Sequence, residues 1–263
     1  MEKFGYLPDP PSSKDHNFTN DLRPKLVRFF EGDSDLRPYC TESNQYSLAA
    51  CAGNASIDSV EIVNAIEGKP SVQLSRLFVY TLARNMVDED GDGHSDINKD
   101  EGTYIRLCFD VLSKFGVCRE DIPAGQGGWP YDLSKAFILP DLKAMRAATA
   151  HRIHSYYRIY ETGNDRLEAI MAALQGLHPV VFGTTVDESF RRINDLTPWS
   201  PTEADIGGHA MVVVGYLRGL GFIVKNSWGA DWGENGFCIM KTEVFTSSKT
   251  RDIWVPTSGT LFR

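Results

Sequence analysis

Residues 225–237 read KNSWGADWGENGF, and the stretch 207–217 shortly before them reads GGHAMVVVGYL. Both combine a run of apolar, β-rich sequence with one chemically active side chain. His209 opens an apolar run, and Asn226 directly follows the apolar run 221–225. Runs of β-branched and aromatic residues bounded by glycine and polar residues are typical of strands. The two stretches therefore predict strands that carry an imidazole and a side-chain amide.

The rest of the chain divides into a helical part and a β-rich part. Apolar residues recur at helical spacing in four segments of the first 175 residues, whereas the later segments follow a strand pattern. Helices are expected at 47–66, 74–84, 103–115 and 165–175, and strands at 179–186, 209–217, 221–225 and 236–241. Helices first and strands afterwards predict an α+β protein with a helical lobe beside a β lobe. A cleft between the lobes is the natural place for chemistry.

A third feature lies near the start of the first predicted helix. Residues 44–51 read NQYSLAAC, which puts Cys51 near the helix N-terminus and six residues after Gln45. A helix N-terminus carries about half a positive charge and favours a thiolate over a thiol. Cysteine, histidine and asparagine together supply a nucleophile, a base that later acts as an acid, and a group that orients the imidazole. Gln45 would donate a side-chain N–H to the oxyanion alongside the backbone N–H of Cys51.

Each of these residues also has a purely structural interpretation. A lone cysteine on a helix is usually a packing residue, and a lone histidine is usually a core residue with its hydrogen bonds satisfied. Trp228 and Trp232 are both compatible with packing, and for Trp232 packing is the interpretation we adopt. The joint occurrence of the thiol, the imidazole and the two amides favours a catalytic site over these alternatives.

KNSWGADWGENGF, with GGHA upstream, resembles the papain-like cysteine peptidases, and NQYSLAACAGNA at 44–55 is similar to the nucleophile segment of their bacterial members. The resemblance spans residues 38 to 242 and implies the two-lobed papain-like fold, with a central nucleophile helix and an antiparallel β lobe. It implies these roles: nucleophile, Cys51; base and acid, His209; orienting residue, Asn226; oxyanion hole, Gln45; substrate-binding residues, Gly207, Gly208 and Trp228. The tryptophan would also shield the contact between the imidazole and the amide from water.

The nucleophile segment departs from the family pattern at several positions. Tyr46 stands where the family usually has glycine, and Ala49-Ala50 stands where it has Gly-Ser. Leu48 occupies the place of a half-cystine in eukaryotic members, so that disulfide is not expected. The bulkier side chain of Tyr46 would tighten the oxyanion hole or cover the cleft.

The resemblance implies a hydrolase, a thiol protease that cleaves a peptide or protein substrate through a thioester acyl-enzyme and needs no cofactor for the chemistry. Two alternatives use the same cleft. A catalytically weak papain-like module would bind peptides without cleaving them, and Tyr46 with Ala49-Ala50 is its support. An acyl transferase or ligase would pass the acyl group to an amine, which product analysis with and without added amine would reveal.

The stretch 87–102, VDEDGDGHSDINKDEG, is an acidic insertion without apolar periodicity. It matches the opening of a calcium loop, with oxygen ligands at alternate positions and a glycine at the sharp turn. Lys99 occupies the place of the final glutamate of an EF-hand, so the pattern is closer to the short DxDxDGxxD calcium repeats. The expected ligands are Asp88, Asp90, Asp92, His94 and Asp96. Two alternatives stay open: a structural Ca²⁺ that orders the loop without touching the chemistry, and a solvated acidic loop.

Residues 1–38 form an extended lead-in rich in proline, aspartate, serine and arginine, and residues 39–263 form the peptidase domain. The lead-in has two interpretations. As a short inhibitory pro-segment it would lie along the cleft, with Tyr6 and Leu7 contacting it. As a structural strap it would only brace the domain.

The composition of the chain narrows which partners, locations and disulfides are expected. The formal net charge of −8 argues against nucleic acid as a partner. No apolar run of about 18 residues occurs, so no membrane span is expected. The first residues lack the basic start and apolar stretch of a signal peptide, so the cytoplasm is the default expectation, although a calcium loop would fit export by another route. Five cysteines are too few for a disulfide scaffold. Separately, we expect the protein to be a monomer.

Overall fold

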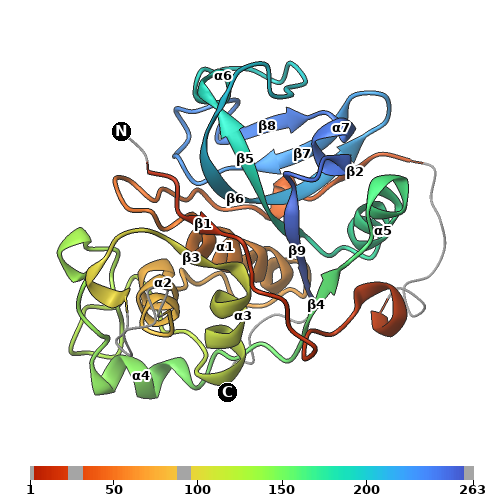
Figure 1. Cartoon of the computed structure of the whole chain (residues 1–263). Coiled ribbons are helices and arrows are strands. Elements are labelled where there is room, and N and C mark those ends of the chain that lie inside the picture. Colours follow the sequence, from red (N-terminus) through yellow and green to blue (C-terminus); the bar gives the residue numbers. More distant parts are fainter. Residues whose placement is uncertain (1–2, 23–31, 88–95, 258–263) are drawn as a thin grey trace.

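The computed structural model describes residues 3–22, 32–87 and 96–257. Helices gather in one lobe and strands in the other (Figure 1). The helical lobe contains α1 (Cys51–Ile66), α2 (Arg76–Arg84), α3 (Ile105–Lys114) and α4 (Leu142–Ala148). The helices α5 (Gly163–Gln175), α6 (Glu188–Arg191) and α7 (Thr242–Thr246) accompany the strands. Single helical turns are η1 (Phe18–Leu22), η3 (Arg37–Tyr39), η4 (Asp96–Asn98) and η5 (Leu133–Lys135).

One antiparallel sheet of seven strands builds the β lobe. Its order is β4 (Tyr156–Ile159), β9 (Arg251–Pro256), β5 (Val180–Asp187), β6 (Asp205–Leu217), β7 (Gly221–Lys225) and β8 (Phe237–Met240), with β2 (Ser34–Asp35) paired to β6. The longest of these strands, β6, pairs with β5 on one side, where Thr184 lies opposite His209. On its other side Val212 lies opposite Lys225, the last residue of β7. This register brings Asn226, the next residue, to the neighbourhood of the imidazole.

The helix α1 lies at the centre of the molecule, between the other helices and the sheet (Figure 1). Every residue from Cys51 to Asn64 is buried, because α1 packs against α2 and α3 on one side and against β6 on the other. Burial on all sides fixes the N-terminus of α1 against the strand that carries His209.

Residues 3–10, which we call the strap, run between the two lobes across the start of α1 (dark red in Figure 1). Within the strap, β1 (Tyr6–Leu7) pairs in parallel with β3 (Thr103–Tyr104), and the N–H of Thr103 donates to the carbonyl of Gly5 at 2.9 Å. At its far end the indole N–H of Trp254 donates to Asp9 at 2.8 Å. The strap is therefore held by both lobes.

The predicted α+β class and the predicted helices and strands are confirmed, with different ends for some elements. The first helix begins at Cys51 rather than at 47, because residues 45–48 form a turn in which the N–H of Leu48 donates to the carbonyl of Gln45. His209 lies inside β6 rather than at its start, since the strand already begins at Asp205. The elements α4, β4 and β9 were not predicted from the sequence. All three are short, and β9 is also buried on both faces, so it lacks the alternation of a half-buried strand.

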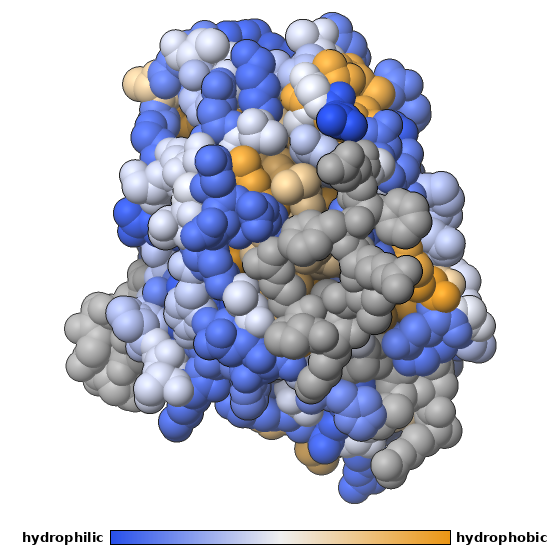
Figure 2. Space-filling view, turned by 90° about the vertical axis from the view of Figure 1, so that its right-hand side faces the viewer, coloured by the Kyte–Doolittle hydropathy of each residue, from blue (hydrophilic) through white to orange (hydrophobic). Residues whose placement is uncertain are grey.

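The face of the molecule in Figure 2 is mostly hydrophilic, with hydrophobic residues in separate spots. Within the described ranges, none of the helices has the length and apolar character that a membrane crossing requires. All five cysteines are free thiols, which agrees with the expectation that the fold does not rest on disulfides.

Candidate active site

Cys51 is the first residue of α1, and its side chain is completely buried. The backbone N–H groups of Ala210 and of Gly5 donate hydrogen bonds to its sulfur. The sulfur therefore lies next to the residue that follows His209 on β6, and beneath the strap. Burial raises the pKa of the Cys51 thiol to about 11, although these N–H groups act to lower it. With the strap in place, burial therefore favours the neutral thiol, against the helix N-terminus and the N–H donors, which favour the thiolate.

The imidazole of His209 and the amide of Asn226 are in direct contact. The His209 Nε2 and Asn226 Oδ1 atoms lie 2.8 Å apart, and the backbone N–H of Ser227 also donates to this oxygen at 2.8 Å. Because Oδ1 accepts, Nε2 carries the proton and the lone pair of the neutral ring lies on Nδ1. Among the described residues Nδ1 has no hydrogen-bond partner, although it is buried. Burial and then the charge of Arg191 lower the pKa of His209 to about 4, against the opposing effect of the Asn226 contact.

Gln45 lies buried in the turn before α1 and donates through its side-chain amide. Its Nε2 atom donates to the carbonyl of Leu48 at 2.8 Å and to the carbonyl of Lys3 at 2.9 Å. The hydroxyl of Ser227 donates to Gln45 Oε1 at 2.8 Å, which fixes which end of the amide faces the cleft. A carbonyl oxygen of the strap thus already occupies the amide N–H that would serve an oxyanion.

Aromatic rings surround the imidazole. The Trp228 ring lies 4.9 Å from the His209 ring, centroid to centroid, and covers it at a tilt of 31°. The Phe4 ring of the strap meets the imidazole edge-on at 5.8 Å and lies 6.0 Å from Trp228. The guanidinium of Arg191 stands 4.5 Å from the centre of the Phe4 ring. Trp232 is buried and packs edge-on against Trp228 at 5.5 Å, a packing contact.

The two glycines before His209 face the strap closely. A Cβ atom on Gly207 would lie 2.6 Å from the Phe4 ring, and one on Gly208 would lie 2.7 Å from the carbonyl oxygen of Tyr6. Any side chain at these positions would push the strap away. The predicted substrate-binding glycines therefore form a smooth wall on which a polypeptide segment already lies.

Tyr46 takes the left-handed conformation, with a φ of 50°, where the family's glycine would fit without strain. Its side chain is exposed and leans on Tyr131, with ring centroids 5.9 Å apart. The departure from the family pattern at this position therefore alters the rim of the site and strains the backbone.

Asp100 was not predicted as a site residue, yet it ties three segments together around Cys51. Its Oδ1 atom accepts from the backbone N–H of Ala49 at 3.0 Å and from the hydroxyl of Tyr80 at 2.7 Å. Its Oδ2 atom pairs with Lys3 Nζ at 2.7 Å. Sequence patterns link Asp100 only to the acidic insertion, because they carry no information about contacts 51 or 97 residues apart.

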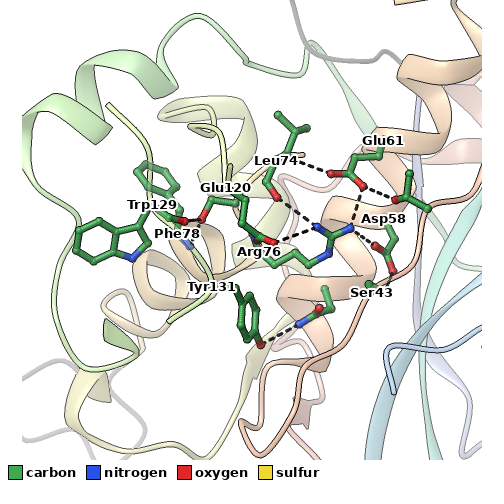
Figure 3. A network of polar contacts seen from close by, with 12 residues as sticks. Ser43, Asp58, Glu61, Leu74, Arg76, Phe78, Glu120, Trp129 and Tyr131 are labelled. Atoms are coloured by element: carbon green, nitrogen blue, oxygen red, sulfur yellow. Dashed lines mark hydrogen bonds and ion pairs between the residues drawn. The ribbon is translucent and has the colours of Figure 1, made fainter. Parts of the chain in front are cut away.

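A buried charge network supports α1 from the helical side (Figure 3). The Arg76 guanidinium on α2 pairs with Asp58 at 2.9 Å and with Glu61 at 2.8 Å, both on α1. Glu120 approaches the same guanidinium at 3.8 Å. Paired, hydrogen-bonded charges of this kind hold one arrangement of the two helices, since separating any member strands a buried charge.

The predicted calcium ligands Asp88, Asp90, Asp92 and His94 lie outside the described residues, and of Asp96 only the backbone, at the start of η4, is described. Within the described part of the chain, no three metal-ligating side chains gather at one place. The calcium site stays a prediction.

A thiol, an imidazole–amide pair and a second amide thus meet at the junction of the two lobes. A family model described as papain family cysteine protease matches residues 37–253. A peptidase C1-like protein of Acanthamoeba polyphaga mimivirus, itself uncharacterized, is 30% identical over 96% of this chain and 86% of its own length. Among solved structures, xylellain, a cysteine protease from Xylella fastidiosa, aligns over 97% of this chain and 96% of its own with a TM-score of 0.80 and 27% identity.

The bromelain protease from Ananas comosus, solved in complex with the E64 inhibitor, shares the fold, with a TM-score of 0.64, 21% identity and coverage of 87% of this chain and 100% of its own. The chain belongs to the papain family of cysteine proteases. It has the two-lobed papain-like fold, and it is a papain-like cysteine peptidase, a hydrolase whose substrates are peptides or proteins.

Proposed function

We propose that this enzyme hydrolyses peptide bonds through a triad of Cys51, His209 and Asn226 and a thioester acyl-enzyme. His209 Nδ1 takes the proton of the Cys51 thiol as the sulfur attacks the scissile carbonyl carbon. The C–N bond then breaks, the imidazolium returns its proton to the departing amine, and the acyl group stays on sulfur. Water, deprotonated by the same nitrogen, attacks the thioester and releases the carboxylic acid and the thiol.

The oxyanion of each tetrahedral intermediate would accept hydrogen bonds from Gln45 Nε2 and from the backbone N–H of Cys51. The position of the Lys3 carbonyl, 2.9 Å from this Nε2 atom, supports the assignment because a carbonyl oxygen of another polypeptide segment fits there. Asn226 would hold the imidazole by its Nε2 atom, and Trp228 would keep water from that contact.

One observation carries the proposal. The hydrogen bond between His209 Nε2 and Asn226 Oδ1 leaves Nδ1 as a buried ring nitrogen with no partner among the described residues. The next residue in the chain, Ala210, donates its backbone N–H to the Cys51 sulfur. A histidine held by an amide at one ring nitrogen, with the lone pair of the other nitrogen left unbonded, has the arrangement that a general base needs. A base about to accept a thiol proton has one nitrogen free.

The test is covalent labelling followed by product analysis. Because the strap lies over His209 and the Cys51 sulfur, the test uses the full chain with Phe4→Ala, which loosens the strap. Intact-protein mass should increase by one epoxysuccinyl peptide inhibitor on this chain and not on its Cys51→Ala form. Fluorogenic peptides should be cleaved only by the chain that keeps Cys51, to acids, and an added amine should not replace water in the product. A transpeptidation product would favour the transferase. Binding of peptide without any cleavage or adduct would favour the binding module and end the proposal.

The strap would keep this peptidase latent. Phe4 lies over the imidazole, where the leaving amine must take up its proton, and Gly5 lies at the sulfur. In a substrate, the residues on the leaving-group side of the cleft follow the scissile bond in sequence. In the strap, Phe4 occupies that side and precedes Gly5, which lies at the sulfur. The strap therefore runs opposite to a substrate, so its peptide groups are presented in the wrong sense for attack, and it blocks the cleft without being cleaved.

We also propose that Ca²⁺ orders the acidic insertion. Arg84 fixes the end of that insertion by donating to the carbonyls of Ile97 at 2.9 Å and Lys99 at 2.6 Å, and Asp100 then reaches the nucleophile segment. Neutralising the crowded carboxylates would stabilise this end. Isothermal titration should show binding at or below millimolar Ca²⁺, weakened in an Asp90→Asn, Asp92→Asn double variant. The absence of binding heat at millimolar Ca²⁺ would end the idea.

Size-exclusion chromatography is expected to show a monomer.

A further inference from the structure

The side chain of Tyr6 fills a pocket whose wall is bare backbone. A Cβ atom built on Gly183 in β5 would lie 2.1 Å from the Tyr6 ring, and one on Gly208 in β6 would lie 3.1 Å from it. Neither glycine has a positive φ, so neither is needed for an unusual backbone conformation. Glycine in the middle of a strand weakens the strand and marks a place where something approaches closely. Here the two glycines make room for a flat ring.

A buried carboxylate closes the far end of the pocket. The hydroxyl of Tyr6 donates to Asp252 Oδ2 at 2.5 Å, and the backbone N–H of Asp9 donates to the same oxygen at 2.7 Å. Asp252 has a φ of 51°, a conformation that costs a non-glycine residue energy. Strain at a buried, ligand-facing residue is often retained for function. When the strap leaves, this oxygen loses both of its strap donors at once.

The pocket belongs to the acyl side of the cleft. The strap passes from Phe4 at the imidazole, through Gly5 at the Cys51 sulfur, to Tyr6, so Tyr6 lies across the sulfur from the leaving-group side. A substrate side chain in this pocket would therefore come from a residue that precedes the scissile bond.

Charge around the pocket selects against a cationic side chain. The guanidinium of Arg158 already donates to Asp252 Oδ1. Arg158, Arg166 and Arg251 line the adjoining cavity of about 270 Å³, together with Asp9 and Asp252. A lysine or arginine from a substrate would add positive charge to a site whose carboxylate is already neutralised. A phenol supplies a donor without a charge.

We propose that, once the strap has left, this pocket binds a tyrosine side chain of the substrate on the acyl side of the scissile bond, with Asp252 accepting its hydroxyl. The proposal rests on the proposed peptidase function. It makes Asp252, Gly183 and Gly208 the specificity-determining residues, and it makes Tyr6 an internal imitation of the substrate side chain. Phenylalanine would fill the same space but leave the buried carboxylate without its donor, which a site built for a hydroxyl disfavours.

The test uses the full chain with Phe4→Ala, which loosens the strap outside the pocket. Quenched-fluorescent peptides carry tyrosine, phenylalanine, leucine or arginine at each of the three positions before the cleaved bond, which mass spectrometry locates. At one position kcat/KM should favour tyrosine over phenylalanine by roughly tenfold to a hundredfold, the range for a hydrogen bond to a charged group. Arginine should be the poorest of the four.

Asp252→Gly is the decisive variant, because glycine accepts the positive φ and Arg158 keeps a second partner, Asp15, at 3.0 Å. The ratio of tyrosine to phenylalanine should fall to about one. Asp205→Asn, an exposed carboxylate on β6 paired with Lys249, is the matched control and should keep the ratio. Gly183→Ala provides a second test, since it should lower kcat/KM for both aromatic substrates while sparing a peptide with alanine at that position.

Binding to the Cys51→Ala form of the same variant separates this proposal from the proposed function. Fluorescence anisotropy with the labelled tyrosine and phenylalanine peptides measures the pocket without chemistry. Tyrosine-selective binding without hydrolysis by the active chain would keep the pocket and overturn the peptidase proposal. Hydrolysis with equal rates for tyrosine and phenylalanine at every position, or an unchanged ratio in Asp252→Gly, would overturn the pocket and keep the peptidase.

Discussion

Lys225 Nζ lies 2.5 Å from Asp58 Oδ2, and both side chains are buried, with 3% and 2% of their surface exposed. Lys225 immediately precedes Asn226, whereas Asp58 stands on α1 two turns after Cys51. The hydroxyl of Ser43 joins the same ammonium at 2.6 Å. This ion pair therefore connects the residue next to the orienting amide with the helix that carries the nucleophile, across the junction of the lobes.

Replacing Lys225 by methionine should destabilise the protein strongly. Removing one partner of a buried pair leaves the other charge uncompensated and typically costs about 3–5 kcal/mol. Urea unfolding should show this loss, and Lys249→Met, which breaks the exposed pair with Asp205, should cost less than about 1 kcal/mol. A Lys225→Met chain as stable as the wild type would contradict the account.

The same pair predicts an acid dependence of stability. Burial acts to raise the pKa of Asp58, but Lys225 and Arg76 outweigh it, so this pKa lies below its ordinary value. A depressed carboxyl pKa contributes stability that is present above the unfolded pKa and is lost as the pH falls through the folded pKa. Lys225→Met should therefore show a smaller drop in the free energy of unfolding between neutral pH and pH 3 than the wild type does.

Ser227 should matter through Gln45. In the Phe4→Ala chain, whose strap is loosened, Gln45→Ala removes an oxyanion donor and should lower kcat by roughly 10²–10³-fold with little change in KM. Ser227→Ala keeps the donor but removes the hydroxyl that fixes the orientation of the amide, so kcat should fall by about tenfold. Ser134 is an exposed serine in the helical lobe, and Ser134→Ala is the control. A larger effect on KM than on kcat would mean that the glutamine binds substrate rather than the transition state.

The chemically informative residues were predictable because each has a strong local context. Cys51 stands at the start of a long apolar helix, and Asn226 and Trp228 follow a strand in a distinctive run. The contacts that set the state of the site were not predictable, because they join distant segments. Nothing in the sequence near Asp100 or Asp252 indicates that the first would hold Ala49 or that the second would face Tyr6, 246 residues away. The lead-in was predictable as an extended segment, and Tyr6 was among the residues expected at the cleft, but the places of Phe4 at the imidazole and Gly5 at the sulfur depend on tertiary contacts.

The thiol should become reactive when the strap loosens. Under the strap, burial holds the pKa of Cys51 near 11 and that of His209 near 4, so at pH 7 both groups are neutral. Phe4→Ala removes the ring from the imidazole and admits water, which should lower the thiol pKa and raise the iodoacetamide labelling rate at pH 7 by at least about tenfold. Intact-mass kinetics would measure this, with Cys51→Ala to identify the site and the exposed Phe137→Ala as control. Equal labelling rates in Phe4→Ala and the wild type would contradict a covering role for the strap.

The strap should also open as the pH rises through neutrality. Burial first, and then the nearby charge of Asp252, raise the pKa of Asp9 from an ordinary 3.8 to about 7. The groups facing Asp9 from neighbouring elements are Asp252 and the indole N–H of Trp254 on β9 and the backbone and guanidinium of Arg106 on α3, with the Tyr6 hydroxyl on the strap itself. The donors lower the pKa of Asp9, but less than burial and Asp252 raise it.

The direction of this pH dependence follows from the linkage between protonation of Asp9 and docking of the strap. A carboxyl whose pKa is higher in the docked strap than in the free strap favours docking at low pH, and this contribution is lost as the pH rises through the docked value. Hydrogen exchange of residues 4–9, corrected for intrinsic rates, should show protection that falls by up to about tenfold per pH unit above 7. Asp9→Asn stays uncharged and should keep its protection at pH 8.5, whereas Asp33→Asn, an exposed carboxylate in the same lead-in, should behave as the wild type. Equal protection of the wild-type strap at pH 6 and pH 8.5 would show that Asp9 does not control its release.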